Sequence, residues 1–542
     1  MTRPTSLRER AAQLLMIRLG SNVPPPTPAE ADESRVAKLL AECPVGGLIV
    51  FRGTCPDLRG TLDRLQGTSP IPLLVASDLE RGLGQQVRGA TRFPHAMALG
   101  HAPDADDAIA ALARITAREA RAAGIHLAFA PVVDVHLHEE NPIIGPRAFA
   151  SSPEHVARCA EIYIGAANAE GLLTCAKHFP GHGRTVSDSH DGLPVVDVSA
   201  DRLRESDLLP FRRAIEAGVD TVMTAHVAYP SLDSSGRPAT ASAPILRDLL
   251  RDEMGFSGCV VSDSLLMEGI RDDAAGPGAR AAALVDAGVD LLLDPQEPRA
   301  VVDGLVDAVE SGRLSEERFH DAFERVWQLK VRAFSAEGKE TDPPSVEQVG
   351  CDGHRQKALN VAARGAKIRQ DLGEMPDYGR GEGVVLVRFE RGTTPEAQPM
   401  EALLAEVLPA AELHVLHPAV PADQRSAAER AAEDAALLVC IVAAEPAAWQ
   451  SFGLPPDLET MAAKMLERRV ASKRKEALLA VLGSPTAGDR VGARVSAGGH
   501  LARVDFFSDE AVSREAFVQG LARRLGSGPL ERGSAEAKVS EW

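Results

Sequence analysis

Residues 172–179, LLTCAKHF, form a short apolar run that carries a lysine and a histidine just before its last residue. Seven further runs of this kind, rich in Leu, Val and Ile, lie between the N-terminus and residue 295. Stretches with the composition of amphipathic helices separate them, so the sequence predicts repeated βα units. The other runs are QLLMIRL (13–19), GGLIVF (46–51), PLLVASD (72–78), HLAFAPVVDV (126–135), DTVMTAHV (220–227), GCVVSDS (258–264) and DLLLDP (290–295).

Eight buried strands with crossovers in this span favour a (β/α)8 TIM-type barrel over an open doubly wound sheet. Helices are expected at 104–124, 153–172 and 314–334, the last of which ends the barrel. In a barrel the reactive groups lie at the carboxyl ends of the strands. The polar residues that close or follow the apolar runs are Asp78, Asp134, Lys177, His178, His226 and Asp263.

The remainder of the chain predicts a second, smaller α/β domain. We expect the barrel to cover residues 1–335, a polar linker 336–350, a sandwich-like α/β domain 351–527 and a disordered tail 528–542. Strand-like runs in the second domain carry few titratable groups at their ends, so packing or oligomerisation is its expected role. The sequence does not specify the oligomeric state. These runs are GVVLVRF (383–389), ELHVLH (412–417), AALLVCIVAA (435–444) and ALLAVLG (477–483).

Composition excludes several classes of partner. Among 542 residues, 59 Lys and Arg face 77 Asp and Glu, so the formal charge of −18 disfavours nucleic acid and anionic membranes. The seven scattered cysteines form no CxxC pair, which argues against a disulfide framework and a zinc module. No secretory signal and no run of eighteen apolar residues occur, so we expect a protein of the reducing cytoplasm.

The segment 177–194, KHFPGHGRTVSDSHDGLP, is a loop that concentrates titratable side chains. His178 and His182 are four residues apart, but FPGHG cannot lie inside a helix and no HExxH pattern is present, so no metal site is expected. Asp188 lies two residues before His190, and a carboxylate beside an imidazole can orient it and raise its pKa. His190 could then act as an acid and afterwards as a base. The alternative is that both are solvated turn residues.

Asp263 ends a fully apolar strand, where a carboxylate of a barrel would point into the mouth. Its alternative role is to cap the helix that follows the strand. An aspartate in this position can act as a nucleophile that forms a covalent glycosyl intermediate, provided that an acid lies across the scissile bond.

Four motifs resemble one family. AKHFPGHGRTVSDSH, VVSDSLLMEGI, FAPVVDVHLHEENPIIGPRAF and SDLERGLGQQV are similar to the β-N-acetylglucosaminidases of glycoside hydrolase family 3, the NagZ-type enzymes of peptidoglycan recycling. The similarity covers roughly residues 10–335. It implies a retaining mechanism in which Asp263 is the nucleophile, His190 is the acid/base and Asp188 tunes His190.

The resemblance also implies sugar-binding residues. The commoner motif has an arginine eight places after the first aspartate, where this sequence has Gln86, so the contact passes to Gln86 or to Arg81 or Arg88. Arg184 stands where many relatives have Asp. The expected substrate-binding residues are Asp78, Gln86, Arg147, Lys177 and His178.

The expected activity is therefore hydrolysis of a terminal GlcNAc from muropeptide fragments, with a small carbohydrate as the partner and no metal or organic cofactor. A phosphorylase of the same family is one alternative, because a neutral imidazole does not repel an incoming phosphate. An inactive carbohydrate-binding barrel is another. We further expect Lys177 and His178 to hold the sugar, Gly181 and Gly183 to form a hinge for a lid, and His182 to stabilise the loop.

Overall fold

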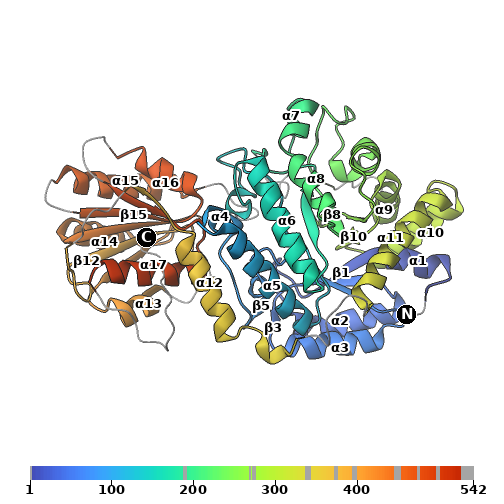
Figure 1. Cartoon of the computed structure of the whole chain (residues 1–542), viewed down its shortest axis with the longest axis horizontal. Helices are drawn as coiled ribbons and strands as arrows, with labels where there is room; N and C mark the ends of the chain where they lie inside the picture. Colours follow the sequence, from blue (N-terminus) through green and yellow to red (C-terminus); the bar gives the residue numbers. More distant parts are fainter. Residues whose placement is uncertain are drawn as a thin grey trace. The chain divides into compact units, whose positions relative to one another are not determined.

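The computed structural model describes residues 3–186, 192–267, 270, 276–335, 344–370, 376–392, 400–444, 453–472, 476–495 and 501–526 (Figure 1). The chain forms two compact units. We call them the barrel unit (Met1–Arg92, Ile109–Ile144 and Ala148–Arg355) and the sheet unit (Phe93–Ala108, Gly145–Arg147 and Gln356–Trp542).

Eight strands among the described residues of the barrel unit form a closed ring of parallel neighbours. Strand β1 pairs with both β2 and β10, isolated bridges join β6 to β7, and the Val261–Leu291 bridge joins β9 to β10. Each strand lies inside one of the eight predicted runs, so the prediction of a TIM-like α/β barrel is confirmed. The strands are β1 Leu15–Leu19, β2 Gly47–Val50, β4 Leu74–Ser77, β6 Leu127–Ala128, β7 Cys175–Phe179, β8 Thr221–Thr224, β9 Cys259–Val261 and β10 Leu292–Leu293.

Helices surround these strands (Figure 1). The Ser152 side chain caps α6 and proline occupies its first turn, while Ser315 caps α11. Such caps satisfy backbone N–H groups that have no partner inside the helix. The three predicted helices are confirmed. The helices are α1 Leu7–Gln13, α2 Ala29–Glu42, α3 Asp57–Thr68, α5 Ala105–Ala123, α6 Pro153–Ala169, α7 Ala200–Glu205, α8 Leu209–Glu216, a π-helix Pro244–Glu253, α9 Gly276–Ala287, α10 Pro298–Glu310 and α11 Glu316–Phe334.

The segment that follows the barrel helices packs against α5. Residues 336–343 of the predicted linker lie outside the described residues, whereas Gly350 N donates to Glu119 Oε1 at 2.9 Å. The same buried carboxylate accepts from Thr91 N and Thr91 Oγ1 and lies 2.8 Å from His354 Nδ1. Glu119 therefore attaches residues 350–354 to the barrel unit.

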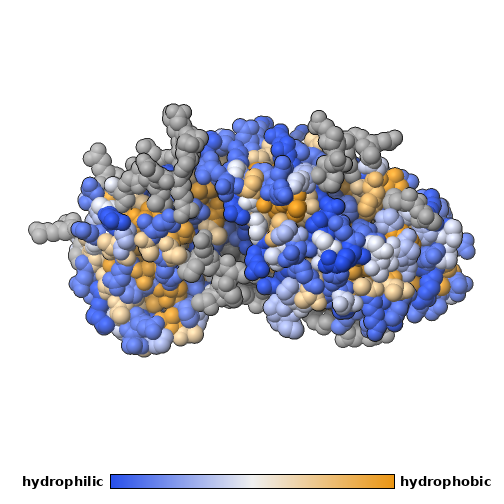
Figure 2. Space-filling view, turned by 90° about the horizontal axis from the view of Figure 1, so that it is seen from below, coloured by the Kyte–Doolittle hydropathy of each residue, from blue (hydrophilic) through white to orange (hydrophobic). Residues whose placement is uncertain are grey.

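The surface mixes hydrophilic and hydrophobic residues, as Figure 2 shows for one face. In the part of the chain that the structure describes, no helix combines the length and apolar character needed to cross a bilayer. All seven cysteines fall within the described ranges and are free thiols, and five of them are buried.

The sheet unit is built on a six-stranded sheet of order β11-β16-β15-β14-β12-β13. Only the β11–β16 pair is antiparallel among these described strands. The strands are β11 Lys367–Gln370, β12 Val384–Phe389, β13 Glu412–Leu416, β14 Leu437–Ala444, β15 Glu476–Gly483 and β16 Ala502–Asp505, and the helices are α12 Asp352–Arg364, α13 Met400–Val407, α14 Ala422–Asp434, α15 Pro456–Ala471, α16 Pro485–Gly492 and α17 Ala511–Arg524.

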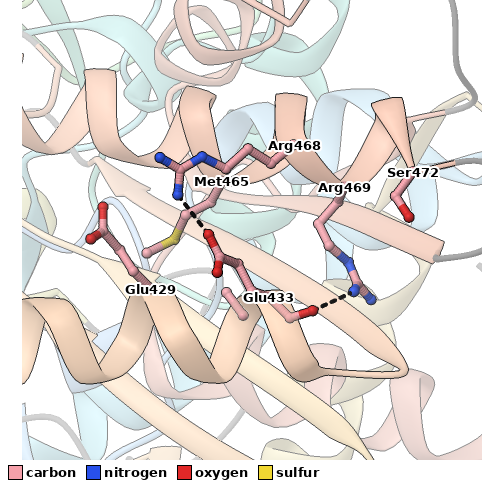
Figure 3. Close-up of a pocket in the computed structure, with 7 residues that line it drawn as sticks. Glu429, Glu433, Met465, Arg468, Arg469 and Ser472 are labelled. Carbon is pink, nitrogen blue, oxygen red and sulfur yellow. Dashed lines mark hydrogen bonds and ion pairs between the residues drawn. The ribbon is translucent and has the colours of Figure 1, made fainter.

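Helices cover both faces of this sheet, and its central strand β14 is apolar at every position. On β14, Leu438 and Cys440 pack toward α14, α15 and α16. A small hollow of about 80 Å³ lies between α14 and α15 (Figure 3). There Arg468 pairs with Glu433 at 2.8 Å, and Arg469 donates to backbone carbonyls at the end of α14. These arginines join the two helices.

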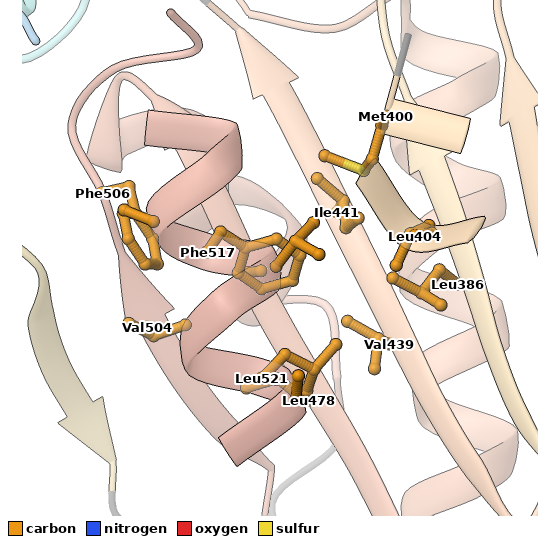
Figure 4. Close-up of a cluster of buried hydrophobic side chains, with 14 of the residues drawn as sticks. Leu386, Met400, Leu404, Val439, Ile441, Leu478, Val504, Phe506, Phe517 and Leu521 are labelled. Carbon is orange, nitrogen blue, oxygen red and sulfur yellow. The ribbon is translucent and has the colours of Figure 1, made fainter. Parts of the chain in front are cut away.

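The alternate residues of the same strands face α12, α13 and α17. Val439 and Ile441 pack with Phe517 and Leu404 in this second core (Figure 4). A two-residue alternation between two buried faces is the pattern of a sheet sandwiched by helices. The segment Phe93–Ala108, which includes the helix α4 (Ala96–His101), belongs to this unit because Phe507 packs on Met97 and Ala98 and the His101 ring.

Lys330 on α11 is fully buried in the barrel unit, and its hydrogen-bond partner is the neutral amide of Gln13. Burial lowers the pKa of Lys330 to about 7. The unfolded chain binds this proton up to a pH of about 10.4, so the parent should gain stability as the pH rises from about 7 to 10. We expect Lys330→Met to be more stable than the parent at pH 7, with the difference shrinking toward pH 10 in urea denaturation.

Lys38→Met on α2 is the matched control, because Lys38 is exposed. Its unfolding midpoint should follow that of the parent at every pH. A constant offset between the Lys330→Met variant and the parent from pH 7 to 10 would show that Lys330 is protonated in the fold.

Candidate active site

Lys177 is the middle residue of β7 and is almost fully buried. Its Nζ is 2.8 Å from Asp78 Oδ1 and 2.8 Å from Glu80 Oε1, two carboxylates that follow β4. The Asp78 side chain keeps 27% of its surface exposed, whereas Lys177 keeps 2%. The ammonium group therefore fixes a carboxylate that can still accept hydrogen bonds from a ligand at the barrel mouth.

Asp134 fixes the start of the loop after β7. Its Oδ2 lies 2.7 Å from His178 Nδ1 and accepts from His178 N at 3.2 Å, while its Oδ1 accepts from His182 N at 2.6 Å. Burial acts to raise the pKa of Asp134, but His178, His182 and these hydrogen bonds bring it below its ordinary value. Because the carboxylate is bonded to Nδ1, it orients the His178 ring.

His182 is buried in the same loop. Its Nδ1 lies 2.8 Å from Thr185 Oγ1, and its carbonyl accepts from Asn141 Nδ2. Burial, with the nearby charge of His178, lowers the pKa of His182 to about 4, so its imidazole is neutral at neutral pH. These contacts agree with the expectation that His182 stabilises the loop.

Gly181 and Gly183 allow close packing rather than a hinge. A Cβ on Gly183 would lie 1.7 Å from the Val135 carbonyl oxygen, and Gly181 has a φ of 136°. Tyr229 donates from its hydroxyl to Gly181 O at 2.7 Å, and Arg184 Nε donates to Asp207 at 2.9 Å. The segment 181–184 is thus attached to the barrel, which does not support the expected swing at these two glycines.

Asp263 follows β9 at the same end of the barrel and is partly accessible to solvent. Its Oδ1 accepts from Ser264 N at 2.7 Å, the next residue rather than a later turn of a helix, so the capping alternative is not supported. Burial acts to raise the pKa of Asp263, but the charges on His178, His226 and Lys177 and the Ser264 amide bring it below the ordinary value. The surroundings of Asp263 therefore favour its ionised form.

The remaining residues predicted for the site are Gln86, Arg147, Asp188 and His190. Gln86 is nearly buried, and its Oε1 accepts from Asn22 Nδ2 at 3.2 Å, which links it to the segment after β1. Arg147 ends a short 3-10 helix, Gly145–Arg147. Asp188 and His190 lie outside the described residues.

No role was predicted from the sequence for Glu80, Asp134 or His226. Asp134 and His226 each close an apolar run, and Glu80 lies two residues after Asp78. Their positions at or just after strand ends are the sequence feature that could have indicated these three residues. In the described ranges, no group of three or more His, Cys, Asp or Glu side chains is arranged to hold a metal ion.

The fold and these residues define a class: a TIM-like barrel with buried charged pairs and a partly accessible carboxylate where barrel enzymes carry their active sites. The model of the glycosyl hydrolase family 3 N-terminal domain matches residues 6–329. This chain belongs to glycosyl hydrolase family 3.

Curated relatives agree with that membership. The chain is 33% identical over 371 residues to a β-N-acetylglucosaminidase/β-glucosidase of Cellulomonas fimi, an alignment that covers 66% of this chain and 65% of the relative. It is 35% identical over 329 residues to β-hexosaminidase A of Pseudoalteromonas piscicida, covering 55% of each. The chain thus spans less than two thirds of the length of these two relatives.

Solved structures match over nearly the whole chain. A family 3 β-N-acetylglucosaminidase from Paenibacillus sp. str. FPU-7 is 27% identical, with a TM-score of 0.81 over 96% of this chain and 97% of the other. A β-glucoside phosphorylase is 21% identical, with a TM-score of 0.77 over 97% of this chain and 92% of the other. At that identity the second match shows the shared fold alone.

Proposed function

We propose that this protein is a retaining exo-β-N-acetylglucosaminidase that removes terminal GlcNAc, with muropeptide fragments as its substrates. The observation that carries the proposal is the partly accessible Asp263 carboxylate that follows β9. Electrostatic interactions with His178, His226 and Lys177 help to lower its pKa. The names of the curated relatives, β-N-acetylglucosaminidase and β-hexosaminidase, support the substrate class.

The proposed reaction is a double displacement. His190 protonates the leaving oxygen while Asp263 attacks the anomeric carbon, which forms a glycosyl ester and releases the aglycone. His190 then removes a proton from water, which attacks the same carbon and frees Asp263. Asp188 orients His190. A low pKa suits the role of Asp263, because only the ionised form is a nucleophile.

The buried pairs at the mouth would hold the sugar. Asp78 keeps part of its carboxylate accessible beside Lys177, and His178 is oriented by Asp134, so both can bind hydroxyl groups in fixed directions. Arg147 and Gln86 complete the proposed binding set. The chemistry needs neither a metal nor an organic cofactor, since acid, base and nucleophile are all side chains.

The direct test is turnover of 4-nitrophenyl β-N-acetylglucosaminide by the purified protein, with 4-nitrophenyl β-glucoside as the matched control substrate. We expect free GlcNAc as the product, released first as the β-anomer in a time course by proton NMR, and faster turnover than with the glucoside. A GlcNAc-terminated muropeptide should release GlcNAc as well.

The same assays run with added inorganic phosphate separate the alternatives. If GlcNAc 1-phosphate formed in proportion to phosphate, the protein would be a phosphorylase. Faster release from the glucoside would overturn the substrate class. Binding of GlcNAc without turnover of any of these substrates would indicate a carbohydrate-binding barrel.

A further inference from the structure

Ser264, the residue after Asp263, is bonded at three of its atoms. Its backbone N donates to Asp263 Oδ1 at 2.7 Å, and its carbonyl oxygen lies 3.2 Å from His226 Nε2. Its hydroxyl donates to Asp294 Oδ2 at 3.1 Å. Two of the partners come from other strands of the barrel, since His226 follows β8 and Asp294 follows β10.

A chain of buried hydroxyl groups orients His226. Its Nδ1 lies 2.8 Å from Thr240 Oγ1, which is 2.8 Å from Thr224 Oγ1 and 3.0 Å from the Ala225 carbonyl. All three side chains are fully buried. Because a carbonyl oxygen only accepts, His226 Nε2 must carry the hydrogen that it donates to Ser264 O. The ring is therefore held at both nitrogens, and its donor is directed at the Ser264 peptide.

Asp294 is held on the opposite side of Ser264. Arg18 on β1 donates from Nε to both carboxylate oxygens of Asp294, at 2.8 and 3.0 Å. Asp294 N donates to Met16 O at 2.7 Å, and Asp294 has a φ of 58°, a left-handed conformation that few residues other than glycine adopt. A residue kept in that conformation by an ion pair and a backbone hydrogen bond provides a fixed acceptor for the Ser264 hydroxyl.

We infer that His226, Thr240 and Asp294 are positioning residues that fix the Asp263 carboxylate through the peptide and the hydroxyl of Ser264. The Ser264 amide donates to Oδ1 at 2.7 Å, which restrains the orientation of the carboxylate. The inference rests on the proposed role of Asp263 as the nucleophile. Small displacements of a reacting group lower the reaction rate by large factors. Contacts from three strands that hold Asp263 in one position should therefore raise kcat.

The same arrangement favours the ionised form of Asp263. Among the described residues, the titratable and charged groups that act on Asp263 or contact Ser264 and its partners include Lys177 and His178 on β7, His226 after β8, Asp294 after β10 and Arg18 on β1. His182, in the loop after β7, also interacts electrostatically with Asp263. Loss of the His226 orientation should raise the pKa of Asp263 toward its ordinary value. The acid limb of the pH profile of kcat/KM reports the ionisation of an essential base or nucleophile in the free enzyme. Loss of the His226 orientation should therefore move this acid limb to higher pH.

The experiment compares Thr240→Val, which removes the partner of His226 Nδ1 without changing the shape, with Thr240→Ser, which keeps the hydroxyl. On 4-nitrophenyl β-N-acetylglucosaminide we expect Thr240→Val to lower kcat about 10-fold, with KM within about twofold, and to shift the acid limb upward. Thr240→Ser should stay within about threefold of the parent.

The matched control is Thr221→Val. Thr221 is equally buried on β8, but its hydroxyl donates to Thr174 O at 3.1 Å, away from Ser264. Its kcat and its acid limb should equal those of the parent. Equal losses of kcat in Thr240→Val and Thr221→Val, with unshifted acid limbs, would overturn the inference, because both losses would then reflect a general change in the barrel.

Crystal structures of the Thr240→Val and Thr221→Val variants give a readout that does not depend on turnover. We expect Asp263 to change rotamer or the Ser264 peptide to rotate in Thr240→Val alone, and an unmoved Asp263 and Ser264 would overturn the inference. If Asp263→Asn retained the parent turnover, the proposed nucleophile would be wrong, whereas the crystallographic comparison would still decide whether the network positions Asp263.

Discussion

Asp263→Asn is expected to lower kcat/KM on 4-nitrophenyl β-N-acetylglucosaminide by about 10⁴-fold, since the loss of a covalent nucleophile has effects of this order. Asparagine has nearly the same shape and can still accept from Ser264 N, as Asp263 does at 2.7 Å. It lacks the negative charge that His178, His226 and Lys177 stabilise. The change therefore removes the nucleophile while the surrounding contacts remain.

Asp303→Asn is the matched control, because Asp303 on α10 has a side chain that is 56% exposed and pairs with Arg8 at the surface. This variant should keep the kinetic constants of the parent. Equal turnover by Asp263→Asn and the parent would contradict the assignment of Asp263.

Azide offers a positive test of the same role. In Asp263→Gly, azide can enter the space left by the carboxylate and bond to the anomeric carbon while 4-nitrophenolate leaves. The product should be the α-glycosyl azide, because one displacement replaces two. A β-glycosyl azide, or no stimulation by azide, would indicate that another group attacks the sugar.

The barrel strands could be predicted because both of their faces are buried. A run such as Gly47–Val50 is apolar at every position and stands out between polar helices. The edge strand Lys367–Gln370 could not be found in this way, since all four of its residues are exposed and the strand is polar. Its pairing with β16 depends on backbone hydrogen bonds that leave no hydrophobic pattern.

The site residues could be predicted where a polar side chain closes an apolar run, as Lys177, His178 and Asp263 do. Their partners could not, because the Lys177–Asp78 and His178–Asp134 pairs join residues 99 and 44 positions apart. Such pairs depend on the order of strands in the closed barrel. The roles of Gly181 and Gly183 also depend on distant neighbours, Asp207 and Val135, whose approach no local pattern indicates.

Asp134→Ala is expected to have the second large effect, and on stability as well as on activity. Asp134 is nearly fully buried and accepts from His178 N and His182 N, and it lies 2.7 Å from His178 Nδ1. Alanine would leave two buried amides and a histidine ring without their acceptor. Removing one partner of such a buried group costs about 3–5 kcal/mol, which should appear as a lower free energy of unfolding in urea.

Activity should fall about 100-fold in the same variant, because His178 and the loop that leads to Asp188 and His190 both lose the contact that orients them. Asp134→Asn keeps one oxygen acceptor. Its activity and its free energy of unfolding should therefore lie between those of Asp134→Ala and of the parent. Asp286→Ala is the matched control, since Asp286 is 57% exposed in a surface pair with Arg247, and surface pairs contribute about 0–1 kcal/mol. Equal unfolding free energies for Asp134→Ala and Asp286→Ala would contradict the role of Asp134.

The pH dependence provides a further check on Asp134. The folded-state pKa of this carboxyl is below its ordinary value, so its contribution to stability is present above the unfolded-state pKa of about 3.9. That contribution is lost as the pH falls through the lower folded-state pKa. The stability difference between the parent and Asp134→Ala should therefore stay constant from pH 5 to 8 and shrink only in stronger acid. A difference that instead shrank above pH 5 would contradict this contribution of the ionised Asp134 carboxylate.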